Sequence, residues 1–346
     1  MNIYEIDPTT DERWEDLLQS HPRASIFHSR GWLQALCKTY GYTPTAFTTS
    51  PPGHPLTNGI PFCRITGFFG KRRLVALPFS DHCEPLVGDL EELKSILTFL
   101  QHQRDIEQWD YVEMRPASSE LAAGTEFAKS QTFSFHKLNL CHSPEKIFHS
   151  FHKNCVQRKI RRAEREGLVY EKGTTDLLLR KFYQLLLQTR RRHGVPIQPL
   201  SWFRNLIGCL DPGLTIRVAS KYGRAIASIL TLRYKHVLVF KYGCLDRRFS
   251  KYGGMQLLLW RAIEEAKQSD LWEFDLGRSD SDNPGLVTFK DRWGAVRSEL
   301  VYLRCGTHSS HRLAKVQQAS INKYLWSHAP CFMITAAGRA FYRHLG

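Results

Sequence analysis

Several short motifs that mark common enzyme classes are absent from this 346-residue sequence. It contains no G-x-S-x-G elbow, no G-x-G-x-x-G fingerprint and no Walker A run, which argues against a serine hydrolase, a dinucleotide enzyme and a P-loop NTPase. Its nine cysteines include no C-x-x-C pair and none has a histidine at metal-ligand spacing. We therefore expect reduced, mostly buried thiols, no metal site and no covalent catalysis.

Long apolar runs are also lacking. The longest uncharged apolar run near the end, residues 331–338, is much shorter than the roughly 20 residues that span a bilayer. The first residues, MNIYEIDPTTDERW, include acidic side chains and no basic stretch followed by an apolar one, so no secretory signal is predicted. The sequence predicts a cytoplasmic protein, and peripheral contact with the inner face of the membrane is compatible with this location.

Positive charge, by contrast, is plentiful. Lysine and arginine outnumber aspartate and glutamate by 48 to 33, which gives a formal net charge of +15. Such a surplus favours nucleic acid, an anionic membrane or a phosphorylated substrate as partner and does not choose between them, and a basic surface without a role is the alternative. Apolar residues make up 42% of the chain, so packed cores are expected, and the length predicts two domains.

The first predicted domain, residues 1–143, mixes helices and strands. Trp14 and its apolar neighbours have helical spacing, and a second helix is predicted over residues 31–40 with Ser29 as its N-cap. Strand-like runs follow at residues 60–65, 73–78 and 111–114.

The second predicted domain, residues 144–305, begins with a helix over 153–165 that is basic on most of its surface and stops at Gly167. We then expect, in chain order, a helix over 175–193, strands within 217–232 and 236–242, a helix over 255–266 and strands at 271–277 and 298–304. Residues 306–346 are predicted to form a basic helical tail. The fold class is mixed α and β.

A glycine pair, Gly253 and Gly254, stands between a strand and a helix. Glycine lets the backbone approach a ligand closely, and the free amides of a helix N-terminus bind anions. Because Arg247, Ser250 and Lys251 precede the pair, the segment is a candidate site for a phosphate or an acyl donor. A tight turn without a ligand is the alternative.

The stretch FDLGRSDSDNPGLVTFKDRWGA places Asp275, Arg278, Lys290 and Trp293 in one strand-loop-helix passage. Acyl transfer to an amine passes through an oxyanion, which a fixed cation stabilises. Lys290 is the candidate for that role, and a surface lysine paired with Asp275 or Asp291 is the alternative.

Proton transfer needs further groups. Tyr242, at a strand end, is a candidate to protonate the leaving group or position the acceptor, and a half-buried packing residue is the alternative. An amine with a pKa near 10 is mostly protonated at pH 7, so some group must take its proton. Asp275 and Asp81 are the carboxylates considered for this role.

Taken in order, several segments resemble the FemAB family. They are FHSRGWLQAL and LVALPFSDHCEPLV in the first half, and KNCVQRKIRRAEREGL, FYQLLLQTRRRHGVP, YGCLDRRFSKYGGMQLLLWRAIEEA, FDLGRSD and GLVTFKDRWGA in the second. The family contains the aminoacyltransferases that build peptidoglycan interpeptide bridges and relatives encoded with exopolysaccharide and exosortase systems. The chain lacks a stretch long enough for the coiled-coil arm of many bridge-forming members, so it is more similar to the exopolysaccharide-associated branch.

The resemblance implies two tandem GNAT-like domains without a bound cofactor. It implies transfer from acyl-CoA, an acyl-carrier protein or aminoacyl-tRNA to an amine of a lipid-linked or nucleotide-linked peptidoglycan or exopolysaccharide precursor. In the matching segments, Lys290 stabilises the transition state, and Arg190, Arg192 and Tyr242 hold the acceptor. Further candidate substrate-binding residues on these segments are Asp81, Arg278 and Trp293.

Two non-catalytic alternatives remain from the charge pattern. The basic helix at residues 153–165 would contact phosphates in a nucleic-acid-binding protein, although no known nucleic-acid-binding signature is present. The basic tail, with Trp326, Phe341 and Tyr342, would contact a membrane surface in a scaffold protein.

Overall fold

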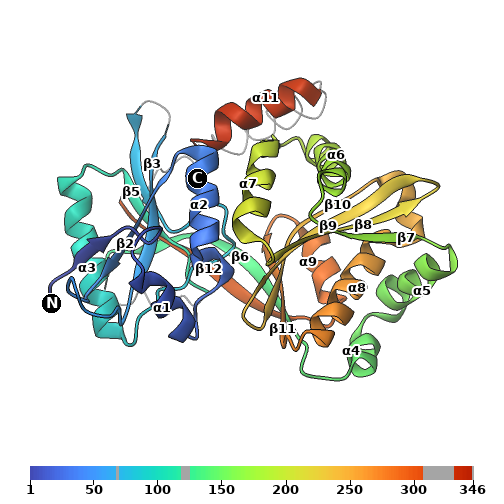
Figure 1. Ribbon diagram of the computed structural model, residues 1–346, viewed down its shortest axis with the longest axis horizontal. Helices are drawn as coiled ribbons and strands as arrows, with labels where there is room; N and C mark the ends of the chain where they lie inside the picture. Colours follow the sequence, from blue (N-terminus) through green and yellow to red (C-terminus); the bar gives the residue numbers. More distant parts are fainter. Residues whose placement is uncertain (68–69, 118–124, 307–330, 345–346) are drawn as a thin grey trace.

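The computed structural model describes residues 1–67, 70–117, 125–306 and 331–344. Within these ranges twelve strands form one mixed sheet, in the order β1-β2-β3-β4-β5-β12-β6-β11-β10-β9-β8-β7, with helices packed against it (Figure 1). The predicted mixed α and β class is confirmed.

The elements of the first half are β1 (Tyr4–Ile6), α1 (Arg13–Ser20), α2 (Arg30–Tyr40), β2 (Thr43–Thr48), β3 (Ile60–Thr66), β4 (Arg72–Val75), α3 (Leu90–Ile106), β5 (Tyr111–Met114) and β6 (Ala128–Asn139). Those that follow are α4 (Pro144–Ser150), α5 (Arg158–Arg165), β7 (Val169–Gly173), α6 (Asp176–His193), α7 (Leu200–Leu210), β8 (Leu214–Lys221), β9 (Arg224–Tyr234), β10 (Val237–Leu245), α8 (Gly254–Gln268), β11 (Glu273–Asp280), α9 (Pro284–Asp291), β12 (Val296–Gly306) and α11 (Cys331–Tyr342).

Most of the helices expected from periodicity are present. Helix α2 begins as predicted, because the Ser29 side chain accepts the backbone N–H of Trp32, and it ends at Gly41 with φ 68°. The predicted helix over 153–165 starts with a π-helical turn at Lys153–Gln157 and continues as α5. The first part of the predicted helical tail lies outside the described residues, and α11 forms its second part.

The elements that were not predicted include β1, β2, α3, β6, α4, β7 and α7. The predicted pair of strands between 217 and 242 is a meander of three, β8 to β10, because Tyr222 and Gly223 form a tight turn with φ 52° and 71°. Two consecutive positive φ values are typical of the hairpin turns that match strand twist.

The two halves of the chain exchange strands. β12, near the end of the second half, pairs antiparallel with β5 and β6 of the first half. β6 in turn pairs with β11. The sheet is therefore continuous past residue 143, and the predicted division into two domains at that residue stays a prediction.

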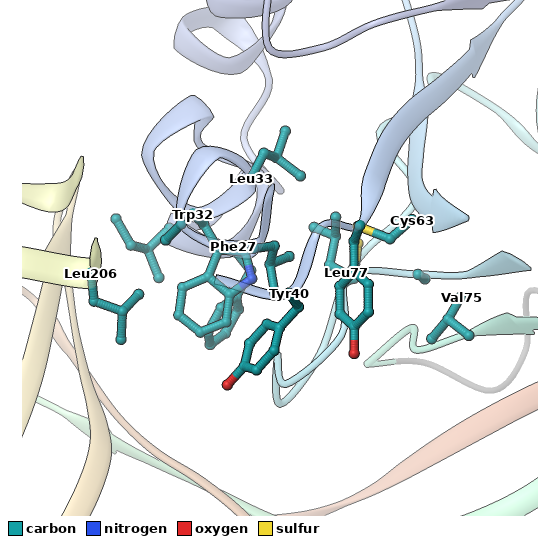
Figure 2. Close-up of a cluster of buried hydrophobic side chains, with 14 of the residues drawn as sticks. Phe27, Trp32, Leu33, Tyr40, Cys63, Val75, Leu77 and Leu206 are labelled. Atoms are coloured by element: carbon teal, nitrogen blue, oxygen red, sulfur yellow. The ribbon is translucent and has the colours of Figure 1, made fainter. Parts of the chain in front are cut away.

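The hydrophobic core also continues from one half to the other. Trp32 of α2 packs edge-on against Trp202 of α7 at 5.3 Å between ring centroids. A Cβ atom at Gly31 would overlap the carbonyl oxygen of Cys209, so glycine permits α2 and α7 to approach closely. Figure 2 shows Trp32 and Phe27 next to Leu206 of α7.

Helix α11 lies across the top of this junction in Figure 1, running from above α2 past α7 toward α6. The Tyr342 hydroxyl donates to the carbonyl of Pro196, and the Tyr42 hydroxyl donates to the carbonyl of Tyr342. The helix thus contacts both halves. None of the helices in the described ranges is long and apolar enough to cross a membrane.

Candidate functional site

Two neighbouring parallel strands part in the middle of the sheet. β10 and β11 pair only from Val237 to Val239 and from Glu273 to Asp275. Just beyond, the register of β10 shifts between Phe240 and Tyr242, and the register of β11 shifts between Asp275 and Arg278. Such bulges redirect side chains and free backbone groups from the sheet. The ionisable side chains of the candidate site gather where the strands part.

Lys290, in the last turn of α9, is one of them. It is 2% exposed, and its Nζ donates to the carbonyl oxygens of Gly277 at 2.8 Å and Arg278 at 2.9 Å. Burial lowers the pKa of Lys290 to about 8, although the nearby carboxylates of Asp81 and Asp275 oppose the shift. The side chain is thus a buried, mostly protonated cation at neutral pH, and the alternative of a surface lysine is wrong.

Asp81 holds two further cations. Its Oδ1 lies 3.0 Å from Nζ of Lys241 and 3.9 Å from Nε of Arg278. Burial would raise the pKa of Asp81, but the two cations outweigh it and hold the pKa below its usual value. Gly277 has φ 71°, and a Cβ there would lie 2.8 Å from the Asp81 carboxylate. This position therefore requires glycine.

His82 and Asp275 form a buried pair beside it. The His82 Nε2 is 3.1 Å from Oδ2 of Asp275, whose Oδ1 accepts the N–H of Gly277 at 2.6 Å. Burial would lower the pKa of His82, but Asp275 outweighs it and the pKa is raised. The other ring nitrogen, Nδ1, is buried and has no hydrogen-bond partner among the described residues. The ring is therefore oriented by a carboxylate and has one nitrogen unused.

We call Asp81, His82, Lys241, Asp275 and Lys290 the charge cluster. Sequence reasoning named three of its members and missed His82 and Lys241. Both missed residues are direct neighbours of named ones, in FSDHC and FKYGC. Only the bulges in β10 and β11, which no local pattern predicts, bring them together.

The structure places Tyr242 in a different environment. Its hydroxyl donates to Oε1 of Gln198 at 2.7 Å and accepts the indole N–H of Trp202 at 3.0 Å, and burial raises its pKa. Its ring packs against Phe182 and Phe203. This geometry favours the packing alternative, and the catalytic role of Tyr242 stays a prediction that the contacts do not support.

The other predicted acceptor-binding residues are dispersed. Arg190 and Arg192 lie in the last turn of α6, where Arg192 donates to the carbonyl of Leu245 at 3.4 Å. Trp293 is 0% exposed and packs on Phe151 at 4.9 Å between ring centroids, so it is a core residue. Arg278, stacked on Phe133 at 4.2 Å, is the only one of these four beside the charge cluster in the described structure.

Packing explains the glycine pair at the start of α8. A Cβ at Gly253, where φ is 76°, would overlap the carbonyl oxygen of Lys159 in α5, and one at Gly254 would lie 3.2 Å from Ala227. Close contact with α5 requires glycine at position 253, and close contact with β9 favours glycine at position 254, so packing accounts for the pair without a ligand. The predicted donor residues Arg247, Ser250 and Lys251 are exposed on the short helix before the pair.

A small cavity nevertheless lies at this helix start. It has a volume of about 140 Å³, and Ser250, Gly254 and Phe289 are among its lining residues. Phe289 directly precedes Lys290 in α9, although no member of the charge cluster is among the lining residues. The donor site at this helix start therefore stays a prediction, and the cavity is the space that a donor group could enter. No group of three or more potential metal ligands occurs within the described ranges.

Comparison with known proteins finds relatives of the part of the chain that carries the charge cluster's strands β10 and β11. Residues 150–290, which contain β10, β11 and Lys290, match the acetyltransferase (GNAT) domain family. The UDP-N-acetylmuramoylpentapeptide-lysine N(6)-alanyltransferase of Weissella viridescens is 24% identical over 139 residues, which are 39% of this chain and 41% of that protein. The aligned part thus spans less than half of the relative.

Solved structures share the fold over almost the whole chain. FemX superposes with a TM-score of 0.67 at 12% identity and covers 87% of this chain and 97% of its own. A tandem GNAT protein from the clavulanic acid biosynthesis pathway superposes with a TM-score of 0.54 at 10% identity, over 89% of this chain and 99% of its own. With the acetyltransferase (GNAT) domain matched over residues 150–290, these likenesses show that the chain has a GNAT-like fold.

Proposed function

We propose that this protein is an N-acyltransferase that moves an acyl or aminoacyl group from an activated donor to an amine of a cell-envelope precursor. The observation that carries the proposal is Lys290, a buried cation fixed by two backbone carbonyls where β10 and β11 part. A buried charge is costly, and strongly perturbed ionisable groups concentrate at functional sites.

The reaction would proceed by direct transfer. The neutral amine attacks the carbonyl carbon of the donor, a C–N bond forms, and the C–O or C–S bond to the carrier breaks as the leaving group takes a proton. An ammonium group has three N–H donors, and Lys290 uses two on the carbonyls of Gly277 and Arg278. The third is available to the oxyanion that forms on the carbonyl oxygen, where a fixed cation accelerates the reaction most.

His82 is our candidate to take the proton of the amine. Asp81 is engaged by Lys241, and Asp275 by His82 and the Gly277 N–H, so neither carboxylate predicted for this role has an unengaged side chain. With the Nε2 proton donated to Asp275, Nδ1 of His82 is the acceptor, and the carboxylate stabilises the imidazolium that results. The raised pKa of His82 strengthens it as a base.

The donor and acceptor follow from charge and from the relatives. The curated relative is named for transferring alanine to the lysine of UDP-N-acetylmuramoylpentapeptide. An aminoacyl-tRNA and an acyl-CoA are both polyanions, which suit a chain of net charge +15. We propose a peptidoglycan or exopolysaccharide precursor as acceptor, with Arg190, Arg192 and Arg247 as cations toward the phosphates of either substrate.

A donor screen tests the proposal. Purified protein is incubated with UDP-N-acetylmuramoylpentapeptide and acetyl-CoA, a long-chain acyl-CoA or alanyl-tRNA, and the mass of the acceptor is measured. We expect one donor to add its acyl mass, and Lys290→Met to lose this product while Lys137→Met retains it. Lys137 is a partly exposed lysine on β6, paired with Glu273 outside the charge cluster. Equal product from wild type and Lys290→Met would refute the role of Lys290.

A further inference from the structure

A second basic site lies in the first half of the chain, and it shares no residue with the charge cluster. It is a pocket of about 260 Å³ between the end of α2, strands β3 and β4, and the end of α11. Four arginines line it, Arg64, Arg72, Arg73 and Arg343. None of the described lining residues is acidic.

Two of the arginines are balanced by carboxylates that do not line the pocket. Arg64 pairs with Glu5, and Arg72 lies 3.3 Å from Glu107 on the surface. Arg73 and Arg343 have no such partner among the residues that the structure describes. The guanidinium of Arg73 contacts the Tyr111 hydroxyl and the carbonyl of His344, and its buried Nε has no hydrogen-bond partner in the described structure.

The end of α11 is fastened to the rim of the pocket. The Tyr42 hydroxyl donates to the carbonyl of Tyr342 at 2.8 Å, and the His344 Nδ1 lies 3.0 Å from the carbonyl of Thr66. These contacts on either side of Arg343 hold its backbone at the pocket. Arg343 itself makes no hydrogen bond or ion pair with the described residues.

Four arginines line one pocket and only two of them pair with carboxylates, which leaves an excess of positive charge around it. Arginine binds phosphate through paired N–H donors, and such charge-assisted bonds are among the strongest in proteins. The space is several times the roughly 30 Å³ that one water occupies. Tyr40, Tyr42 and Trp109 form its aromatic wall, which suits an organic group attached to the phosphate.

We propose that this four-arginine pocket binds the phosphate of a phosphorylated organic ligand. The inference does not depend on acyl transfer. Two sources offer this chemistry, a water-soluble phosphate ester or diphosphate and the headgroup of an anionic lipid.

Paired variants test the pocket. In Arg72→Gln/Arg343→Gln, two exposed cations are removed without touching Arg73, whose contacts hold α11. Arg204→Gln is the matched control, because Arg204 and Arg72 are both 53% exposed and each lies 3.3 Å from one surface carboxylate. Binding of inorganic pyrophosphate is measured by calorimetry at fixed ionic strength. Binding to phosphatidylcholine vesicles with and without phosphatidylglycerol is measured by co-sedimentation.

We expect the double variant to bind about tenfold more weakly or worse than wild type, since it loses two charged donors, while Arg204→Gln is unchanged. Loss of pyrophosphate binding supports a soluble ligand. Loss confined to vesicles with phosphatidylglycerol supports a lipid headgroup. The proposal is overturned if wild type binds neither probe, or if the double variant binds each probe as tightly as Arg204→Gln does.

Discussion

The charge cluster and the aromatic residues beside it adjoin at one side chain and differ in almost every other respect. We call Trp32, Trp202 and Tyr242 the aromatic seam. Nζ of Lys241, in the charge cluster, lies 5.8 Å from the Trp32 ring centre and 5.9 Å from that of Tyr242. The seam buries large rings, which stabilises the fold. The cluster buries ionisable groups, which costs free energy unless they are well paired.

This difference separates two residues that the sequence had named as catalytic candidates, Lys290 for the oxyanion and Tyr242 for the leaving group or the acceptor. Lys290 is held with one N–H donor to spare and a lowered pKa, whereas the Tyr242 hydroxyl is engaged as both donor and acceptor. The cluster therefore carries the chemistry in our proposal, and the seam joins α2 to α7. Four predictions test this division.

Truncation of the seam should give the largest effect, and on stability alone. Trp202→Ala removes a fully buried indole and leaves the Tyr242 hydroxyl without its donor, so we expect a loss of about 3–5 kcal/mol in the free energy of unfolding. Urea denaturation measures it. At low temperature the folded variant should keep its transfer rate within about threefold of wild type. A stability loss below about 1 kcal/mol would contradict the structural role of the seam.

Removal of the Lys290 charge should lower the transfer rate and leave stability almost unchanged, the reverse of Trp202→Ala. Lys290→Met is of similar length and carries no charge, so we expect kcat to fall about 10²–10³-fold, the usual cost of one oxyanion donor. Single-turnover kinetics measure the chemical step directly. The urea midpoint should change little, because the lost hydrogen bonds are offset by the relief of a buried charge. A variant that lost stability and kept its rate would show that Lys290 is structural.

Local patterns in the sequence predicted the framework of both regions. The apolar spacing of residues 31–40 and the Ser29 cap identified α2, and the run from Met255 to Ala266 identified α8. β6 was missed because its partners, β11 and β12, come from the other half of the chain and its own residues include many polar ones. Strand exchange of this kind depends on distant pairing that no local window contains.

The chemistry of the site was only half predictable for the same reason. Gly277 is visible as a glycine within a strand, which suggests a bulge, but its need to be glycine comes from Asp81 on a distant loop. Gly253 and Gly254 were predicted either as a donor-binding turn or as a tight turn without a ligand, and contact with α5 and β9 is enough to account for them. A residue type at a turn shows that space is tight and does not show what fills it.

The titration of Lys290 predicts that the transfer rate depends on pH. Since its pKa is about 8, the ammonium is lost above that pH, and the rate of wild type relative to Lys290→Arg should fall about tenfold per pH unit. The ratio cancels the titration of the acceptor amine. Stability should move the other way: the unfolded chain binds more protons between pH 8 and the usual lysine pKa, so this group favours folding as pH rises through that window. If the ratio of the two rates stayed constant from pH 7 to 9.5, the positive charge of Lys290 would have no role in the reaction.

The smallest effect is expected from Tyr242→Phe, the sharpest single-atom test of the division. The change removes only the hydroxyl and leaves Gln198 and the Trp202 indole without this partner, so we expect a loss of about 1–2 kcal/mol in the free energy of unfolding. The transfer rate and its pH profile should stay within about threefold of wild type, because the hydroxyl is already engaged by Gln198 and Trp202 and makes no contact with the charge cluster among the described residues. Single-turnover kinetics and urea denaturation on the same preparation measure both quantities. If kcat fell tenfold or more with stability unchanged, Tyr242 would belong to the reacting centre, and Trp202 and Gln198 would then be the groups that position its proton.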